Sequence, residues 1–309
     1  MKSIQNPIVA VIITAYNMEA YVDQAIRSAA EQTYNRLRIY VVEDCSTDDT
    51  SAIVHRVAEE LNALDTAHVL GRETDYVHIL QHSENAGAGQ ARRTGIDTAV
   101  ADGADFIITL DADDWMDCNF ITALVARHKE TGAPIVSGGI TVEKGDGEYE
   151  ITCYGTHLLT GVERIAKFWG ERIVFMNNKI IHRSIAEKVP YCTRRFVEDT
   201  PTIIPMLYHA DSVAYCTEVG YHYRMQPDSL THTSSPLRWA LYRALCAEDL
   251  MSFFATRNDG EEWLKAIPLH VSFGQQLAVL RQLNPKPEDY APYMADYADL
   301  CTRIIRHLG

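Results

Sequence analysis

The feature of this sequence that most constrains its fold is a regular alternation of short apolar segments with helical segments. The apolar segments are rich in β-branched residues and bounded by polar clusters, as is typical of strands buried on both faces. The intervening segments carry apolar side chains at helical spacing. Strands are expected at residues 7–14, 37–42, 76–80 and 106–110, and helices at 19–31, 49–64 and 90–100. Because parallel strands need helical crossovers, the pattern predicts an α/β fold: an open, mostly parallel sheet with helices on both faces.

The composition is that of a soluble globular protein. Hydrophobic residues make up 47% of the 309 residues and charged residues 23%, and no apolar run reaches the length of a membrane span. The formal net charge of -14 argues against a nucleic-acid-binding surface, since phosphate binding needs a basic face. The seven cysteines form no Cys-x-x-Cys pair, and the N-terminus does not resemble a signal peptide. We therefore expect a cytoplasmic protein with reduced thiols.

The C-terminal part has a different pattern. From Pro236 onward the sequence has helical periodicity, with helices expected at residues 236–257, 270–283 and 291–307. The sequence therefore predicts two units, a sheet-containing domain at 1–235 and a helical C-terminal extension at 236–309.

The most informative polar cluster is residues 110–115, where an apolar strand is followed by three carboxylates within four positions. Like charges this close repel one another, so without a cation or hydrogen-bond donors the pKa of at least one of them would rise. Oxygen ligands in a small cluster suit Mg2+ or Mn2+, which share their coordination with water and a substrate phosphate. The alternative is that Asp113, Asp114 and Asp117 only cap the helix that starts near Asn119.

Further polar clusters follow the other predicted strands, at residues 14–17, 43–48 and 85–92. In an open α/β sheet ligands bind outside the carboxyl ends of the strands, so these clusters are expected to meet the acidic cluster at one edge. No Gly-x-x-x-x-Gly-Lys-Ser/Thr loop is present, which argues against a P-loop nucleotidase. Gly87-Ala88-Gly89 begins like a dinucleotide fingerprint, but Arg92 stands where the third glycine belongs. A diphosphate held by a metal ion is the remaining interpretation.

Five motifs occur in an order and at spacings that match a known family. They are Thr14-Ala15-Tyr16-Asn17, Glu43-Asp44-Cys45-Ser46-Thr47-Asp48, Asn85-x-Gly87 with Ala91-Arg92, Leu110-Asp111-Ala112-Asp113-Asp114, and Glu198-Asp199. One Asp-x-Asp alone is a weak signal, but five ordered motifs form a strong one. Over roughly its first three-quarters the chain resembles family 2 glycosyltransferases. The resemblance implies a GT-A fold and an inverting enzyme that uses a nucleotide-diphosphate sugar.

The resemblance also implies roles for residues that would bind the nucleotide. Tyr16 would stack on a uracil base and Asp44 would accept a hydrogen bond from its ring N–H, with Thr14 in the same nucleotide-binding turn. Arg92 would support the nucleotide or the diphosphate. The structural alternatives are a core aromatic for Tyr16, a helix cap for Asp44 and a solvated helix charge for Arg92.

The acidic cluster would bind the metal and the donor sugar. By resemblance, Asp113 would be the direct Mn2+ or Mg2+ ligand, and Asp111 would contact the metal or the ribose. Asp114 and Trp115 would border the donor sugar.

Glu198 and Asp199 would lie on the acceptor side. Inverting transfer needs a base that deprotonates the acceptor and charge stabilisation on the leaving diphosphate. Asp199 is similar to the catalytic base of the family, and Glu198 would raise the pKa of Asp199 or orient the acceptor. The alternative is that both acids only serve a helix N-terminus.

A later segment, residues 221–229, resembles one that closes over the diphosphate in some family members. Arg224 would pair with phosphate oxygens, and Ser229 would donate a hydrogen bond. His222 or His232 is a candidate to complete the metal shell, although a single histidine is more often structural.

Three positions depart from the family pattern. Glu43 stands where aspartate is usual, Cys45 where a second aspartate is common, and Arg93 where asparagine is common. None is a proposed metal ligand or base, so these departures bear on donor preference more than on the reaction.

The sequence thus predicts a metal-dependent inverting glycosyltransferase that moves a hexosyl or N-acetylhexosaminyl group from a nucleotide-diphosphate sugar, with UDP expected. The expected acceptor is a saccharide or lipid-linked saccharide in cell-surface polysaccharide or glycoconjugate synthesis, which would bring the enzyme to the inner face of the membrane. One alternative is a non-catalytic sugar-nucleotide-binding or scaffold protein of the same fold. Another is a nucleotidyltransferase, which would bring a glycine-rich basic loop where Ala15-Tyr16-Asn17-Met18 stands.

Overall fold

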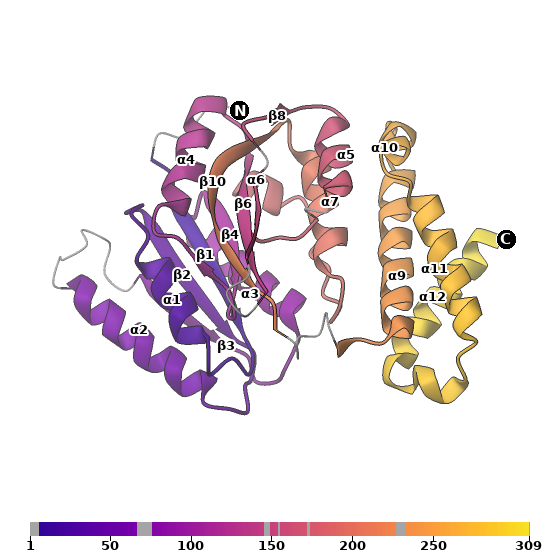
Figure 1. Ribbon diagram of the computed structural model, residues 1–309, viewed down its shortest axis with the longest axis horizontal. Coiled ribbons are helices and arrows are strands. Elements are labelled where there is room, and N and C mark those ends of the chain that lie inside the picture. Colours follow the sequence, from indigo (N-terminus) through magenta and orange to yellow (C-terminus); the bar gives the residue numbers. More distant parts are fainter. Residues whose placement is uncertain are drawn as a thin grey trace.

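The computed structural model describes residues 6–66, 76–144, 149–153, 155–171, 174–226 and 233–308, and a central sheet covered by helices occupies most of it (Figure 1). The strands are β1 (Val9–Ala15), β2 (Leu37–Glu43), β3 (Val77–Gln81), β4 (Phe106–Asp111), β5 (Trp115–Met116), β6 (Ile135–Glu143), β7 (Tyr149–Thr152), β8 (Leu158–Leu159), β9 (Lys179–His182) and β10 (Val213–Arg224). The helices are α1 (Val22–Ala30), α2 (Thr50–Thr66), α3 (Ala88–Ala101), α4 (Phe120–Thr131), α5 (Glu163–Gly170), α6 (Arg183–Ala186), α7 (Asp199–His209), α9 (Pro236–Ala255), α10 (Gly260–Ala266), α11 (Leu269–Leu283), the 3-10 helix η1 (Pro287–Tyr293) and α12 (Met294–Leu308).

The predicted α/β sheet is confirmed. Its strand order is β3-β2-β1-β4-β9-β6-β10-β5, with β7 paired to β6 and β8 paired to β10. The strands β1 to β4 pair in parallel, and β10 is parallel to β6. The short strand β9 lies antiparallel between β4 and β6, so it joins the parallel first half of the sheet to a mixed second half.

Helices cover both faces of the sheet because its central strands are apolar on both sides. In β1, Val9, Val11 and Ile13 face a core shared with α1, α2 and α4. The alternate residues Ala10 and Ile12 face a second core shared with α3, α5 and α7. This two-sided burial is the arrangement that a continuous apolar run predicts.

The first helix begins later than its sequence pattern indicates. Periodicity predicts a helix from residue 19, whereas α1 starts at Val22. The backbone N–H of Met18 donates to Thr50, and that of Glu19 donates to Asp48. These contacts with the start of α2 hold the chain in a turn, and the helix begins only after it.

The C-terminal helices pack on α9, away from the sheet (Figure 1). Leu250 and Phe254 of α9 belong to the core beneath the sheet, whereas Leu241 and Leu245 belong to a third cluster with α11, η1 and α12. The helix starts at Pro236, and the side chain of Ser235 accepts a hydrogen bond from the backbone N–H of Arg238. The division of the chain after residue 235 stays a prediction.

Ion pairs tie these helices to the segment that precedes α7. Arg194 donates to both carboxylate oxygens of Asp249 on α9, and Arg303 on α12 donates to Asp249 at 2.6 Å. Among the helices in the described ranges, none is long and apolar enough to span a membrane.

Candidate active site

The carboxyl ends of β1, β2 and β4 lie side by side at one edge of the sheet. Their parallel register places Thr14 beside Asp111 and Ala15 beside Glu43. The polar clusters that follow these strands therefore converge, as expected for a ligand site in an open α/β sheet.

The turn after β1 presents an aromatic side chain at this edge. Tyr16 is 41% exposed, so it is not a core aromatic, whereas Thr14 is half-buried at the end of the strand. The next residue, Asn17, has a φ of 53°, a left-handed conformation that asparagine adopts more readily than most residues. Its side chain accepts a hydrogen bond from the backbone N–H of Thr47 at 2.8 Å. The turn is thus fixed to the loop after β2 and leaves the ring of Tyr16 accessible.

Asp44 is almost fully buried and holds the loop that leads into α3. Its Oδ1 lies 2.6 Å from His82 Nδ1 and accepts from the backbone N–H of Ala86 at 2.9 Å. Its Oδ2 accepts from the backbone N–H of Gly87 at 2.8 Å. The side chain that bonds the N-terminal backbone of α2 is that of Asp48 instead. The contact of Asp44 with a nucleotide base stays a prediction.

The glycines before α3 allow a close approach between distant segments. A Cβ on Gly89 would lie 2.5 Å from the carbonyl oxygen of Cys192 and 3.2 Å from Cγ of Glu198. Gly87 has a φ of 89°, which disfavours residues with a Cβ. The two glycines therefore bring the segment before α7 against the start of α3, a role different from the dinucleotide fingerprint they resemble.

Asp113 and Asp114 occupy different environments. Burial raises the pKa of Asp113 to about 6, with a further rise from Asp111, and its carboxylate accepts from Gln226 at 3.0 Å. Asp114 is 1% exposed and accepts from the hydroxyl of Tyr221 at 2.6 Å. Burial raises the pKa of Asp114 well above its ordinary value, and the negative charges of Asp111 and Asp113 add to this rise. Asp114 thus supports the acidic loop from within, and the contact of Asp114 with the donor sugar stays a prediction.

Asp111 and Asp113 could supply part of the ligands of a divalent cation, with the substrate supplying others. Among the described residues, no group of three or more histidine, cysteine or acidic side chains is arranged to hold a metal. Two neighbouring carboxylates fit Mn2+ or Mg2+ when water and diphosphate oxygens supply the remaining ligands. The alternative that Asp113, Asp114 and Asp117 cap α4 is not supported, since no side-chain cap of that helix is found among the described residues.

Arg224 and Trp115 brace the acidic loop. The guanidinium of Arg224 lies between the rings of Tyr21 and Trp115, 4.7 and 4.6 Å from their centroids. Its Nε donates to the backbone carbonyl of Asp113 at 3.0 Å. These ring contacts and this hydrogen bond fix the acidic loop. The contact of Arg224 with phosphate stays a prediction.

His222, a candidate to complete the metal shell, lies beside Trp115 and Asp117. His222 stacks on Trp115 with ring centroids 4.8 Å apart, and its Nε2 lies 3.0 Å from Asp117. Ser229 and His232 lie outside the described residues.

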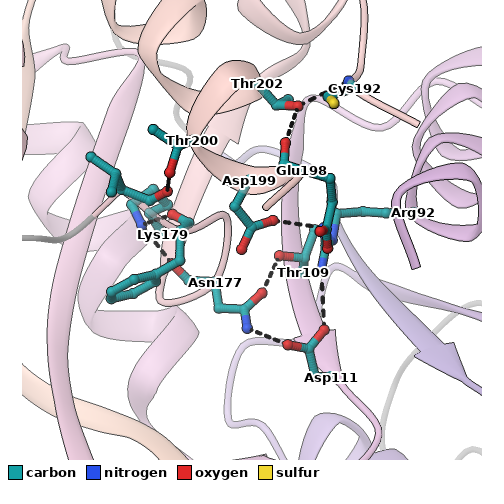
Figure 2. Close-up of polar contacts among 12 residues, drawn as sticks. Arg92, Thr109, Asp111, Asn177, Lys179, Cys192, Glu198, Asp199, Thr200 and Thr202 are labelled. Atoms are coloured by element: carbon teal, nitrogen blue, oxygen red, sulfur yellow. Dashed lines mark hydrogen bonds and ion pairs between the residues drawn. The ribbon is translucent and has the colours of Figure 1, made fainter. Parts of the chain in front are cut away.

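Arg92 joins the acidic loop to the start of α7, as Figure 2 shows. The side chain reaches from α3 and is buried, so it is not a solvated helix charge. Its Nη1 lies 2.7 Å from Asp199 and 3.4 Å from Glu198, and its Nη2 lies 3.3 Å from Asp111. One guanidinium therefore contacts three carboxylates that come from two distant segments.

These charges perturb one another strongly. Burial raises the pKa of Asp199, and Arg92 opposes that rise. Burial, with a further contribution from Asp199, raises the pKa of Glu198 to about 7. Burial alone would lower the pKa of Arg92, but the neighbouring carboxylates outweigh it and raise that pKa. A carboxylate with a raised pKa beside a fixed positive charge is suited to accept a proton.

A turn before β9 adds contacts that the sequence-based prediction missed. Asn177 donates to Asp111 Oδ2 at 2.8 Å and accepts from the hydroxyl of Thr109 at 2.7 Å (Figure 2). Lys179 follows in the chain, and its side chain is completely buried behind the turn. The strand that follows this turn, β9, is only four residues long, so no sequence pattern marks the turn.

The acids at the sheet edge and the mixed second half of the sheet define a GT-A glycosyltransferase fold. Solved structures share it: S. aureus TarS 1-349, in complex with UDP-GlcNAc, has a TM-score of 0.69 at 18% identity, covering 98% of this chain and 81% of that one. Mannosyltransferase PcManGT from Pyrobaculum calidifontis, in complex with GDP-Man and Mn2+, has a TM-score of 0.53 at 17% identity, covering 100% and 82%.

The sequence comparisons give the family. The model of glycosyl transferase family 2 matches residues 10–190, which is more than half of the chain. The glycosyltransferase GlyG of Streptococcus pneumoniae serotype 4 is 24% identical over 75% of this chain and 76% of its own length. The protein belongs to glycosyl transferase family 2 and is a glycosyltransferase, which confirms the predicted family, fold and class of reaction.

Proposed function

We propose that the protein transfers a hexosyl or N-acetylhexosaminyl group, with inversion, from a UDP-sugar to a hydroxyl of a saccharide or lipid-linked saccharide. The observation that carries this proposal is the contact network of Arg92, which places Asp111 of the acidic loop beside Glu198 and Asp199 of α7. Arg92 thus joins Asp111, one of the two proposed metal ligands, to the perturbed acids Glu198 and Asp199.

The donor is assigned to the edge formed by the ends of β1 and β4. The ring of Tyr16 is exposed and available for stacking on the nucleotide base, since every base has a face that stacks on an aromatic side chain. Asp113 and Asp111 would hold Mn2+ or Mg2+, which supplies charge neutralisation to the leaving diphosphate. The complexes of TarS with UDP-GlcNAc and of PcManGT with GDP-Man and Mn2+ support a nucleotide-sugar donor and a metal.

Asp199 is the proposed base. As the acceptor oxygen bonds to the anomeric carbon, the bond from that carbon to the diphosphate oxygen breaks, and the acceptor proton passes to the carboxylate of Asp199. Arg92, 2.7 Å away, favours the ionised form of this carboxylate, while burial raises the pKa of Asp199 and so strengthens it as a base. Glu198 would orient the acceptor hydroxyl.

The cellular setting follows from the proposed acceptor. Synthesis of a cell-surface polysaccharide or glycoconjugate on a lipid carrier would place this protein in the cytoplasm, at the inner face of the membrane. Peripheral association there is part of the same proposal.

The direct test of the base is Asp199→Asn. Removing a general base lowers rates by about 100-fold to 10000-fold, so transfer should fall at least that far while the affinity for UDP changes less than about twofold. Asp97→Asn is the matched control, because Asp97 is an exposed acid on α3 that pairs with Arg93. An Asp199→Asn variant with the transfer rate of Asp97→Asn would end this assignment.

A further inference from the structure

Lys179 is fully buried, which lowers its pKa to about 7, and three oxygen atoms lie within hydrogen-bond distance of its side-chain nitrogen. Its Nζ donates to the carbonyls of Phe175 and Asn177 and to the side-chain oxygen of Asn178, each at 2.7 Å. These bonds use all three donors that an ammonium group has. Lysine is almost never fully buried without such partners. All three acceptors lie in one short turn, residues 175–178, so the ammonium group holds the turn from inside.

The same turn contacts both halves of the proposed active site. Asn177 donates to Asp111 at 2.8 Å, and the backbone N–H of Met176 is oriented so that it lowers the pKa of Asp199, against the rise that burial causes. The hydroxyl of Thr200 also donates to the carbonyl of Val174 at 3.3 Å. Residues 174–177 therefore contact both Asp111, a proposed metal ligand, and the segment that carries the proposed base Asp199.

The far end of the turn is fixed independently. Asn178 has a φ of 58°, and its backbone carbonyl accepts from the N–H of Gly138 at 2.9 Å. Its side-chain nitrogen donates to the carbonyl of Gly138. This end is attached to β6, and Lys179 supplies a buried donor to the carbonyls of Phe175 and Asn177.

We propose that Lys179 is a positioning residue for the transfer reaction: its ammonium group fixes the turn at residues 175–178, which sets Asp111 and Asp199 in place relative to each other. This inference rests on the proposed function. A side chain without an N–H donor at position 179, such as methionine, no longer bonds the carbonyls of Phe175 and Asn177, and the turn relaxes. A displacement of about 1 Å at the reacting groups lowers a rate by about 100-fold.

The test compares Lys179→Met with Arg164→Met. Arg164 is also a buried cation, but it lies against Trp263 on α10. Arg164→Met therefore replaces a buried cation with methionine, as Lys179→Met does, but outside the proposed active site. The rate is read as Mn2+-dependent turnover of UDP-sugars, with UDP-GlcNAc as the first probe. Backbone hydrogen exchange is measured at residues 174–180 and 198–202.

We expect Lys179→Met to lower kcat by about 100-fold with KM for the donor within about threefold, and to speed exchange in both segments. Arg164→Met should leave kcat and exchange in both segments unchanged. A Lys179→Met variant with the kcat of Arg164→Met, or with unchanged exchange at residues 198–202, overturns the proposal.

A second variant keeps the inference testable if Lys179→Met does not fold. Asn177→Ala retains the backbone carbonyl that Lys179 bonds and removes the side-chain contacts with Asp111 and Thr109. It should lower kcat at least about tenfold with little loss of stability, and an unchanged kcat would overturn the inference. Absence of turnover in the wild-type protein would instead count against the proposed function, while hydrogen exchange would still decide whether Lys179 links the two segments.

Discussion

Replacing Arg92 with methionine removes the guanidinium that three carboxylates share. Asp199, Asp111 and Glu198 lie 2.7, 3.3 and 3.4 Å from it, and Arg92 is only 4% exposed. Breaking a buried ion pair by removing one partner costs about 3–5 kcal/mol, and we expect a loss in this range in the free energy of unfolding at pH 8. Since a domain has about 5–15 kcal/mol in all, the variant should fold but be marginal.

The loss should depend on pH in a defined direction. Without Arg92 the pKa values of Glu198 and Asp199 rise further above their unfolded values, because burial and mutual repulsion are no longer opposed. An acid with a raised folded pKa favours folding while it is protonated, and this contribution is lost as the pH rises through that pKa. The deficit of Arg92→Met is therefore largest at pH 8 and smaller at pH 5.

Urea denaturation at both pH values, followed by tryptophan fluorescence, measures this deficit. The control is Arg93→Met, which removes a half-exposed neighbour paired with Asp97 at 3.3 Å and should cost less than about 1 kcal/mol. The reasoning is refuted if Arg92→Met costs no more than Arg93→Met at pH 8, or if its deficit does not shrink at pH 5.

Two further predictions concern the neighbouring charges. Glu198→Gln removes an acid whose pKa burial raises to about 7. The variant should therefore be more stable than the wild type at pH 8 by about 1–3 kcal/mol, and this difference in stability should fade toward pH 5. Equal urea midpoints of the two proteins at pH 8 would contradict this prediction. Asp249→Asn weakens the bonds from Arg194 and Arg303, so it should lower stability by about 1–3 kcal/mol and lower kcat as the segment before α7 loosens. Calorimetric melting and donor turnover measure the second case, and an unchanged kcat would show that the C-terminal helices do not position the site.

The sequence was sufficient to predict the parts of the site that are local. Apolar runs of β-branched residues identify β1, β2 and β4, and the polar residues after them, such as Asp111, must lie at the carboxyl edge once the strands are parallel. Exposure of Tyr16 follows from its place in a turn rather than in a strand.

The contacts made by distant segments were not predictable in the same way. Asn177 and Asp111 are 66 positions apart, and no periodicity relates them. Strand β9 is only Lys179–His182, too short for a pattern, and it pairs between β4 and β6 through tertiary packing. Asp44 has the sequence context of a helix cap, yet it bonds the backbone of Ala86 and Gly87, because the loop before α3 folds back over the end of β2.

The central claim is that the acidic loop binds a nucleotide diphosphate through a metal ion. Titration calorimetry of UDP with and without Mn2+, on the wild type, Asp113→Ala and the control Asp97→Asn, tests it most directly. We expect binding that requires Mn2+, persists in Asp97→Asn and weakens at least about tenfold in Asp113→Ala, since a direct metal ligand is lost. Binding of UDP that is indifferent to both Mn2+ and Asp113 would contradict it, and no binding of UDP, GDP, CDP or dTDP would favour a non-catalytic protein of the same fold.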